Sequence, residues 1–372
     1  MTPLGREIAA LISAEGPISV ARYMALCLSH PEHGYYATRD PFGPAGDFVT
    51  APEISQMFGE LIGLWCAAVW TQMGAPRRVA LIELGPGRGT LMADMLRAAK
   101  AAPDFRDAVA VTLVETSPTL RAVQEQTLET VGVAVRWAAT VDEALDHEHP
   151  VVAVANEFFD ALPIRQFART AAGWRERLVG LSDEGALVFG LAPEAPSDFD
   201  PPERPTGALL EVCPEALAIA ARLGGHVAAH GGAALAIDYG SGFSAGDTLQ
   251  AVRAHGFVDP LAEPGEADLT AHVDFGALAA AARSRGATAM RLATQGDLLD
   301  ALGLAARAAR LCAKASDAQR DAIVAAVARL TDRAPTGMGA LFKALAFADP
   351  RLGPLPGFAP SPSPAPSEGP TP

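Results

Sequence analysis

Residues 79–89 read VALIELGPGRG: an apolar run ends in Glu83, and glycines follow at alternate positions, Gly85, Gly87 and Gly89. A helical pattern begins directly afterwards, with apolar residues at positions 91, 92, 95, 96 and 99. A buried strand, a glycine turn and a helix form the opening unit of a doubly wound α/β domain, where ligands bind at the carboxyl ends of the strands. We therefore expect this turn to border a nucleotide-sized crevice.

The spacing and charge of the turn indicate which ligand it suits. A dinucleotide site uses Gly-x-Gly-x-x-Gly and presents a helix N-terminus to the pyrophosphate. Here the spacing is Gly-x-Gly-x-Gly with Pro86 inside it, and Glu83 places a carboxylate beside the turn. A cationic ligand with ribose hydroxyls matches this charge better than a pyrophosphate, so we expect S-adenosylmethionine as the cofactor rather than NAD.

A second apolar run, residues 112–115, also ends in a carboxylate, Glu115. Ser117 and Pro118 follow it and are favourable residues for the N-cap and first position of a helix. A carboxylate at this strand end accepts hydrogen bonds from the two ribose hydroxyls of an adenosyl cofactor. Glu115 is therefore the expected ribose ligand.

A third strand, predicted over residues 151–156, brings further polar side chains to the same edge of the sheet. The sequence from 151 to 163 reads VVAVANEFFDALP. Polar groups at the end of a buried strand need partners, so we interpret Asn156 and Glu157 as functional, with Asp160 close to the substrate channel. Phe158 and Phe159 are interpreted as core residues, and channel walls are the alternative.

The composition describes a folded protein of acidic character. Of 372 residues, 49% are apolar and 19% charged, and 29 basic against 43 acidic residues give a net charge of −14. This charge argues against non-specific nucleic-acid binding. It fits a basic partner such as an arginine-bearing protein, although simple solubility explains it as well. Four scattered cysteines and a solvated acid–histidine run at 146–149 predict no metal site.

Neither a secretory signal nor a membrane-spanning run is expected, because no apolar stretch approaches about 18 residues. We therefore predict a cytoplasmic protein without a membrane span.

The periodicity along the chain predicts a doubly wound Rossmann-like sheet with additions at both ends. Residues 1–76 are expected to form a helical cap or lid, with helices over 4–14 and 19–28 and a long helix opened by a capping box of Thr50 and Glu53. The cofactor core follows over 77–240, with a β-hairpin inserted at about 164–206. Residues 241–349 are expected to form a helical, substrate-side portion, and 350–372 a disordered tail rich in proline and serine.

Several blocks of the sequence together resemble one family, the MidA-like methyltransferases. They cover residues 34–36, 46–60, 83–89, 156–163, 237–240, 268–275 and 295–297, so the resemblance extends over roughly residues 4–347. Ala51 departs from the serine that many relatives carry in the second block. The resemblance implies a class I S-adenosylmethionine-dependent methyltransferase, whose mitochondrial members are complex I assembly factors that dimethylate an arginine of a core complex I subunit.

Carried onto this chain, the resemblance implies a set of cofactor residues. Glu83, Gly85, Gly87 and Gly89 would shape the methionine end, and Glu115 would hold the ribose. The 46–60 block would fold over the cofactor as part of the lid, and we add Thr50 and Asn156 to the expected cofactor-binding residues.

The arginine assignment makes a chemical demand on the site. A guanidinium has a pKa above about 12 and stays charged in proteins, so its methylation calls for carboxylates that localise the charge away from the attacking nitrogen. The candidates are Glu157, Asp160, Asp47 and Glu53. His272 is an alternative general base for another nucleophile, although a structural role is favoured for it.

Three other functions remain open at this point: a small-molecule methyltransferase, a non-catalytic assembly chaperone that keeps the cofactor fold, and a dehydrogenase. The intact 83–89 turn argues against the chaperone, and its glycine spacing argues against the dehydrogenase.

Overall fold

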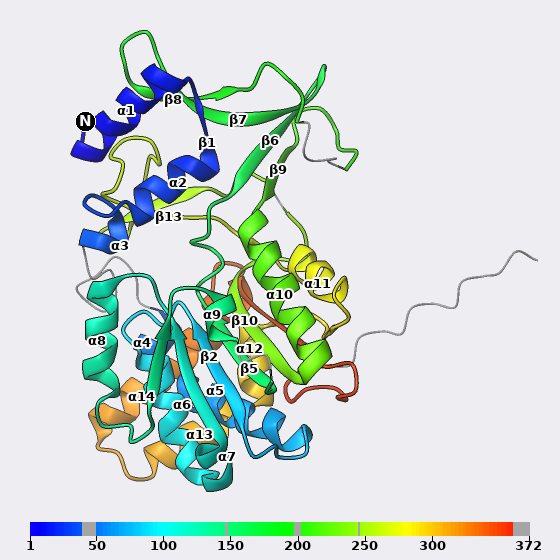
Figure 1. Ribbon diagram of the computed structural model, residues 1–372. Coiled ribbons are helices and arrows are strands. Elements are labelled where there is room, and N and C mark those ends of the chain that lie inside the picture. The colour runs from blue at the N-terminus through cyan, green and yellow to red at the C-terminus, as the bar shows by residue number, and fades with distance from the viewer. Residues whose placement is uncertain (39–49, 146–147, 197–201, 245, 360–372) are drawn as a thin grey trace, which may run out of the picture.

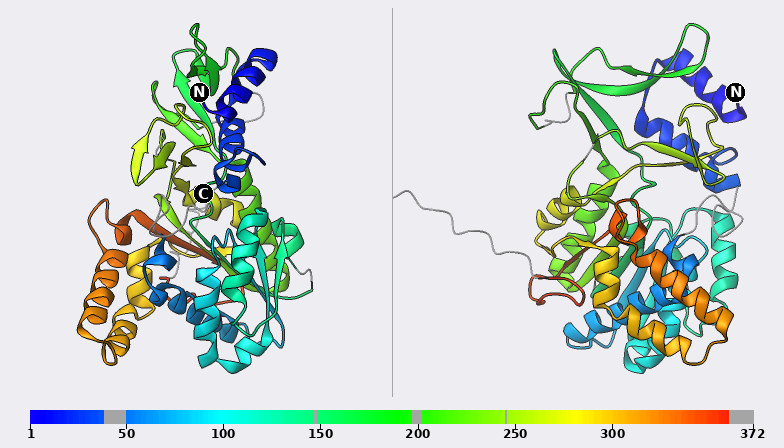
Figure 2. Two further views of the ribbon diagram at one scale, coloured as in Figure 1. Left: turned by 90° about the vertical axis from the view of Figure 1, so that its left-hand side faces the viewer. Right: turned by 180° about the vertical axis from the view of Figure 1, so that it is seen from behind.

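The computed structural model describes residues 1–38, 50–145, 148–196, 202–244 and 246–359. The chain forms two lobes, one above the other in Figure 1. The lower lobe contains a large sheet flanked by helices, and the upper lobe combines N-terminal helices with antiparallel strands. Two further views show the same division and place the helical pair α13–α14, coloured orange, on the flank of the lower lobe (Figure 2).

The lower sheet has the strand order β15-β17-β10-β5-β2-β3-β4. Its parallel strands are β2 (Val79–Leu84), β3 (Val109–Val114), β4 (Val135–Ala138), β5 (Val151–Asn156) and β10 (Gly232–Ser241). On one side of the sheet, β17 (Phe342–Ala348) runs antiparallel to β10. β17 also pairs with two short strands, β15 (Thr288–Ala289) and β16 (Ala293–Thr294). The short strand β14 (Val273–Asp274) pairs in parallel with the end of β10. The predicted doubly wound sheet is confirmed. Because β3 and β5 lie on opposite sides of β2, the topological switch point is at the carboxyl end of β2.

Helices cover both faces of this sheet. One face packs against α5 (Gln56–Gln72), α6 (Thr90–Ala98), α7 (Pro103–Ala108), α12 (Gln295–Ala301), α13 (Leu304–Cys312) and α14 (Asp317–Thr331). The other packs against α9 (Val141–Ala144), α10 (Pro214–His230) and α11 (Phe275–Arg283). Val79 and Leu81 of β2 face the first group and Ala80 and Ile82 the second. By strand alternation, Glu83 therefore points toward the face of α5 and α6.

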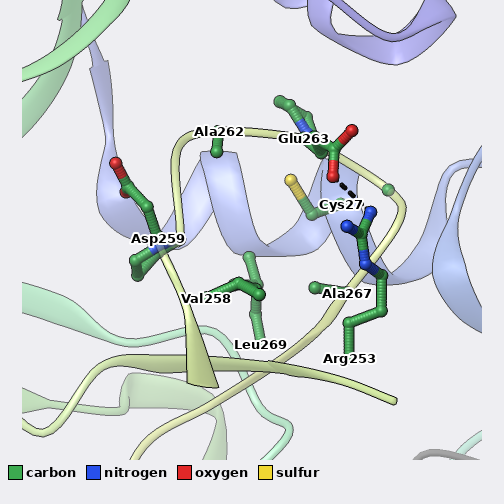
Figure 3. A pocket seen from close by; sticks show the side chains of 11 residues that line it. Cys27, Arg253, Val258, Asp259, Ala262, Glu263, Ala267 and Leu269 are labelled. Carbon is green, nitrogen blue, oxygen red and sulfur yellow. Dashed lines mark hydrogen bonds and ion pairs between the residues drawn. The ribbon is translucent and has the colours of Figure 1, made fainter. Parts of the chain in front are cut away.

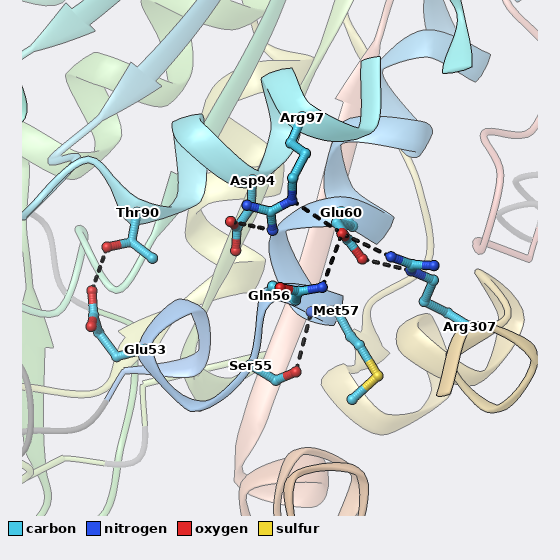
Figure 4. Close-up of polar contacts among 9 residues, drawn as sticks. All are labelled: Glu53, Ser55, Gln56, Met57, Glu60, Thr90, Asp94, Arg97 and Arg307. Carbon is cyan, nitrogen blue, oxygen red and sulfur yellow. Dashed lines mark hydrogen bonds and ion pairs between the residues drawn. The ribbon is translucent and has the colours of Figure 1, made fainter. Parts of the chain in front are cut away.

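A buried carboxylate ties three of these helices together (Figure 4). Glu60 of α5 accepts hydrogen bonds from Arg307 of α13, through Nε (2.6 Å) and Nη2 (3.0 Å), and from Nε of Arg97 in α6 (3.3 Å). Arg97 also pairs with Asp94 (2.6 Å). Helix α13 is thus fixed to α5 and α6 by charge-assisted hydrogen bonds.

The upper lobe has a core of its own. It contains α1 (Pro3–Glu15), α2 (Val20–Ser29), α3 (Tyr35–Thr38) and two antiparallel sheets. One has the order β1-β7-β6-β9 with β8 paired to β7, and its strands are β1 (Ile18–Ser19), β6 (Arg165–Thr170), β7 (Gly173–Leu181), β8 (Leu187–Leu191) and β9 (Leu209–Val212). The other has the order β12-β11-β13, with β11 (Gln250–Arg253), β12 (Gly256–Val258) and β13 (Asp268–Thr270). The predicted hairpin is therefore part of a sheet that the N-terminal segment also joins.

Several expected elements differ from the structure. Within the cofactor core expected over 77–240, α10 is preceded by strand β9, and within the portion expected to be helical, α12 and α13 are separated at Gly303, whose φ is 91°. Strands β11–β13 and β17 lie in a region expected to be helical. A short apolar run such as 342–348 has no periodicity that distinguishes a strand from a helix. It forms a strand because it pairs with β10.

The N-terminal cap and the C-terminal tail also differ from the domain division expected from the sequence. Helix α5, assigned to the N-terminal cap, packs in the core of the lower lobe. The tail expected to be disordered from residue 350 contains Leu355 and Phe358, which are buried there too, and Trp65 donates a hydrogen bond from Nε1 to the Pro356 carbonyl (3.1 Å). Among the described residues, none of the helices combines the length and apolar character that crossing a bilayer requires.

Candidate active site

The glycine turn joins β2 to α6 at the carboxyl edge of the sheet, as the sequence predicts. Gly85, Gly87 and Gly89 have φ angles of 62°, 52° and 82°, which glycine adopts without the strain that a side chain introduces. The N–H of Gly85 donates to the Val114 carbonyl of β3 (3.1 Å), and the N–H of Gly89 to the Pro86 carbonyl (2.7 Å). The turn is thereby held against the ends of two adjacent strands.

Glu83 lies directly beneath this turn and is buried. Burial raises its pKa to about 8, an effect partly offset by a hydrogen bond from the backbone N–H of Met92 in α6. Its Oε2 has no hydrogen-bond partner among the described residues. Glu83 is therefore mainly protonated at neutral pH in the absence of a ligand, and one of its oxygens can accept a hydrogen bond from one.

Glu115 is held in place by groups from α8 (Pro118–Leu128) and the residue before it. Its Oε1 accepts from the N–H of Ser117 (2.7 Å), and its Oε2 from Nε2 of Gln124 (3.2 Å). Burial raises its pKa, and these hydrogen bonds act in the opposite direction. The carboxylate is thus oriented before any ligand arrives.

Gln124 was not predicted as a site residue, although it connects two predicted parts of the site. It is fully buried, and its Nε2 also donates to the Gly87 carbonyl (2.7 Å), while Nε1 of Trp137 donates to its Oε1 (2.8 Å). The sequence did contain a signal. Gln124 lies four residues from both Leu120 and Leu128, so it is a polar residue on the buried face of the helix.

At the end of β5 the structure brings Asn156 and Glu157 together. Oε1 of Glu157 accepts from Nδ2 of Asn156 (3.2 Å) and from the N–H of Ala51 (3.1 Å), at the start of α4 (Ala51–Ile54). Burial and the nearby Asp160 raise the pKa of Glu157 to about 7. Glu157 also has a φ of 50°, and Oδ1 of Asn156 has no hydrogen-bond partner among the described residues. Backbone strain and an unpaired buried polar atom are both typical of functional sites, and both occur at this strand end.

Asp160 belongs to a cluster of buried carboxylates. Burial raises its pKa to about 6. Asp238 of β10 is also buried, and burial together with Asp160 and Glu157 raises its pKa well above the ordinary value. Carboxylates this close do not all ionise at neutral pH unless a cation joins them.

The upper lobe closes over this cluster. The N–H of Ala271 donates to the Asp160 carbonyl (3.0 Å), and the hydroxyl of Tyr36 donates to Oδ1 of Asp268 in β13 (3.1 Å). The backbone carbonyl of Tyr36 also accepts from the hydroxyl of Ser117, beside Glu115 (3.5 Å). Tyr36 therefore connects β13 of the upper lobe with the part of the site that carries Glu115.

The residues predicted on the lid are placed differently. Oε1 of Glu53 accepts from the hydroxyl of Thr90, the first residue of α6 (2.5 Å), so its carboxylate is engaged beside the glycine turn. Thr50 is the N-cap residue of α4 but its side chain makes no capping hydrogen bond. The predicted capping box is wrong because the helix breaks at Ser55, which caps α5 by accepting from the N–H of Met57 (3.2 Å). Asp47 lies outside the described residues.

His272 and the pocket of Figure 3 carry no chemistry that the site needs. Burial lowers the pKa of His272, whose ring lies edge-on to Tyr239 at 5.4 Å. The pocket lies in the upper lobe between α2 and the loop around 258–267; Cys27 lines it, and Arg253 and Glu263 form an ion pair across it. Of the predicted site residues that the structure describes, none lines this pocket. Within the described part of the chain, no group of three or more His, Cys, Asp or Glu residues could hold a metal ion.

Comparison with known proteins gives a consistent picture. A family model described as S-adenosyl-L-methionine-dependent methyltransferase matches residues 61–293. The protein arginine methyltransferase NDUFAF7, mitochondrial, of Danio rerio is 39% identical over 295 residues, which are 73% of this chain and 69% of that protein. The human protein of the same name is 39% identical over 303 residues, 74% of this chain and 68% of its own.

A solved structure shares nearly the whole fold. A protein from Burkholderia thailandensis, solved with S-adenosyl-homocysteine bound, is 31% identical to this chain, with a TM-score of 0.81 over 95% of this chain and 94% of that one. The expected cofactor class is thereby confirmed. The names of the two curated relatives place them in mitochondria, so the cytoplasmic location expected from the sequence is wrong.

Proposed function

Because this chain belongs to the family of S-adenosyl-L-methionine-dependent methyltransferases, we propose that it methylates an arginine of a protein substrate. The observation that carries the arginine assignment is the cluster of buried carboxylates at the ends of β5 and β10, close to the glycine turn. The names of the curated relatives, protein arginine methyltransferases, support it.

The residues around the glycine turn fit the cofactor. The unpartnered Oε2 of buried Glu83 can accept a hydrogen bond from an ammonium group, and the turn at Gly85, Gly87 and Gly89, with its positive φ angles, closely follows Glu83 in the chain. Glu115, already oriented by Ser117 and Gln124, suits the ribose hydroxyls. We assign Asn156 and Thr50 to the border of this site. When bound, S-adenosylmethionine supplies the methyl group.

Glu157 and Asp160 are assigned to the substrate. A guanidinium stays charged in proteins, so its arrival between two carboxylates with raised pKa values stabilises their ionised forms. Hydrogen bonds to the carboxylates would concentrate the positive charge on the bound nitrogens and leave the third free to attack the methyl group. The methylated nitrogen loses a proton after the transfer. We propose that Glu157 accepts this proton, because its pKa of about 7 suits a general base at neutral pH.

Glu53 is assigned to the cofactor side, because its carboxylate is engaged by Thr90 at the glycine turn. Asp47 receives no assignment. A respiratory complex I subunit is the first candidate acceptor, on the strength of the resemblance between the sequence blocks and the MidA-like methyltransferases.

The test has a binding step and a transfer step. Calorimetry with S-adenosyl-homocysteine measures cofactor binding. Protein extract from cells lacking this chain is then incubated with the purified protein and S-adenosylmethionine labelled in the methyl group, and acid hydrolysis shows which amino acid carries the label. We expect labelled methylarginine, strongly reduced by Glu157→Gln and unchanged by Glu125→Gln, an exposed glutamate on α8.

Each other outcome contradicts the proposal in a recognisable way. Label in small molecules alone would identify a small-molecule methyltransferase. Cofactor binding without transfer to any acceptor would favour an assembly chaperone that keeps the fold.

A further inference from the structure

A single buried carboxylate holds the turn that follows β5. Oδ2 of Asp238 accepts hydrogen bonds from three successive backbone N–H groups, those of Phe158 (3.2 Å), Phe159 (3.0 Å) and Asp160 (3.2 Å). Its Oδ1 accepts a fourth from the N–H of Tyr239 (2.9 Å). Both oxygens are therefore engaged with the backbone, and the side chain is fully buried in β10.

The anchored turn carries both carboxylates that we assign to the substrate. The N–H of Glu157 still donates to the Ile237 carbonyl (2.9 Å), which extends the ladder between β5 and β10 by one residue. The chain then leaves the sheet through the φ of 50° at Glu157. A residue with a side chain rarely adopts this conformation, and it persists only where its surroundings enforce it. The three hydrogen bonds to Asp238 begin at the next residue and supply that constraint.

We propose that Asp238 is a positioning residue: by anchoring the N–H groups of residues 158–160, it holds Glu157 in its left-handed conformation and directs Glu157 and Asp160 toward the cationic group of the substrate. The substrate named here rests on the proposed function, whereas the anchoring of the turn is independent of it.

The chemistry of a carboxylate explains why aspartate suits this place. Both oxygens of an aspartate side chain can accept N–H groups, and one of them here accepts three. An asparagine of the same size has one acceptor oxygen and an NH₂ group. In Asp238→Asn the side-chain NH₂ group must therefore face either the N–H groups of the turn or the N–H of Tyr239. The substitution preserves the size of the side chain, so the packing around β10 is retained.

Hydrogen–deuterium exchange on the full-length protein tests the anchoring directly, through peptides that contain residues 158–160. We expect these amides to exchange at least about tenfold faster in Asp238→Asn, because the single oxygen of the asparagine amide cannot accept both from the turn and from the N–H of Tyr239. If that variant does not fold, the same measurement is made on Asp238→Ser, whose shorter side chain still has one oxygen that accepts hydrogen bonds. Calorimetry with S-adenosyl-homocysteine should show that the folded variants retain cofactor binding.

Asp349→Asn is the matched control. Asp349 is also buried, follows β17 at the opposite end of the sheet, and accepts from the N–H and guanidinium of Arg351. We expect this variant to leave both the exchange of 158–160 and the rate of methyl transfer unchanged.

The transfer assay completes the test. Asp238→Asn is expected to lower the rate of methylarginine formation at saturating cofactor at least about tenfold, in line with misplaced substrate-binding groups. Unchanged exchange in a folded variant would overturn the anchoring. Faster exchange with an unchanged rate would overturn the positioning role. If the wild-type protein methylates another acceptor, the proposed function fails, and the same rate comparison on that acceptor decides the role of Asp238.

Discussion

Phe158 packs so closely on Gly85 that a side chain at Gly85 has no room: a Cβ built there would lie 2.7 Å from Cδ2 of Phe158. Gly85 opens the turn after β2, and Phe158 belongs to the turn anchored by Asp238. The contact therefore joins the part of the site that we assign to the cofactor with the part that we assign to the substrate.

Gly85→Ala should strongly weaken cofactor binding, because the added methyl displaces Phe158 and the φ of 62° disfavours alanine. We expect the dissociation constant for S-adenosyl-homocysteine, measured by calorimetry, to rise at least about tenfold. Gly74→Ala is the control, because Gly74 has a φ of 84° but nothing within 4 Å of its Cβ position. It should cost about 1–2 kcal/mol of stability and leave binding intact. Equal affinities in both variants would contradict the steric argument.

Gln124→Leu should also weaken binding of S-adenosyl-homocysteine. It leaves the Gly87 carbonyl and the Glu115 carboxylate without their shared donor, and an unsatisfied buried group costs about 1–3 kcal/mol. We expect the dissociation constant to rise about tenfold while the protein stays folded. Gln126→Leu, at an exposed position of the same helix, should have no effect on binding. A comparable loss of affinity in that variant would show that a change in the helix, rather than the loss of the hydrogen bonds of Gln124, is responsible.

Glu83 should make the stability of the unliganded protein depend on pH. Its pKa rises from 4.5 in the unfolded chain to about 8 in the folded protein, so the folded state binds more protons than the unfolded state between these values. The free energy of unfolding should therefore fall as the pH rises from 4.5 toward 8. Denaturant titrations of the wild type and Glu83→Gln measure this, and the variant should show a shallower decline. An identical slope would mean that Glu83 is not protonated in the free protein.

Asp160→Asn should lower methyl transfer while cofactor binding is retained, because it removes a charge that we assign to the guanidinium. We expect initial rates of methylarginine formation to fall about 10²-fold, the magnitude typical for loss of one electrostatic group in an active site. Asp183→Asn, in the exposed turn between β7 and β8, is the control. A wild-type rate in Asp160→Asn would remove Asp160 from the substrate site.

Local patterns in the sequence were sufficient to predict the carboxyl edge of the sheet, to which we assign the cofactor. The strand before Glu83, the positive-φ glycines and the carboxylate at Glu115 are all set by neighbouring residues, and the structure confirms their placement. The same reasoning failed at Thr50, because Ser55 offered a competing N-cap that the spacing did not distinguish.

The residues that sequence reasoning missed depend on partners far along the chain. Gln124 acts on Gly87, and Asp238 acts on backbone groups about eighty residues before it. Helical spacing marks Gln124 as buried, but neither periodicity nor spacing identifies the partners of Gln124 or Asp238, because these contacts exist only once the strands are paired. Leu355 and Phe358 are similar, since their proline-rich surroundings indicate disorder and only the core of the lower lobe explains their burial.

The antiparallel strand β17 has a consequence for how the protein is made. It pairs with β10 from Ala233 to Tyr239, yet it leaves the ribosome after every residue of the site has been synthesised. Until then β10 presents an open edge, which invites pairing with other chains. A nascent chain thus contains every residue that we assign to the site while β10, the strand that contains Asp238, is not yet paired with β17. We therefore expect chains truncated before residue 342 to aggregate or be degraded, because β10 would keep an open edge.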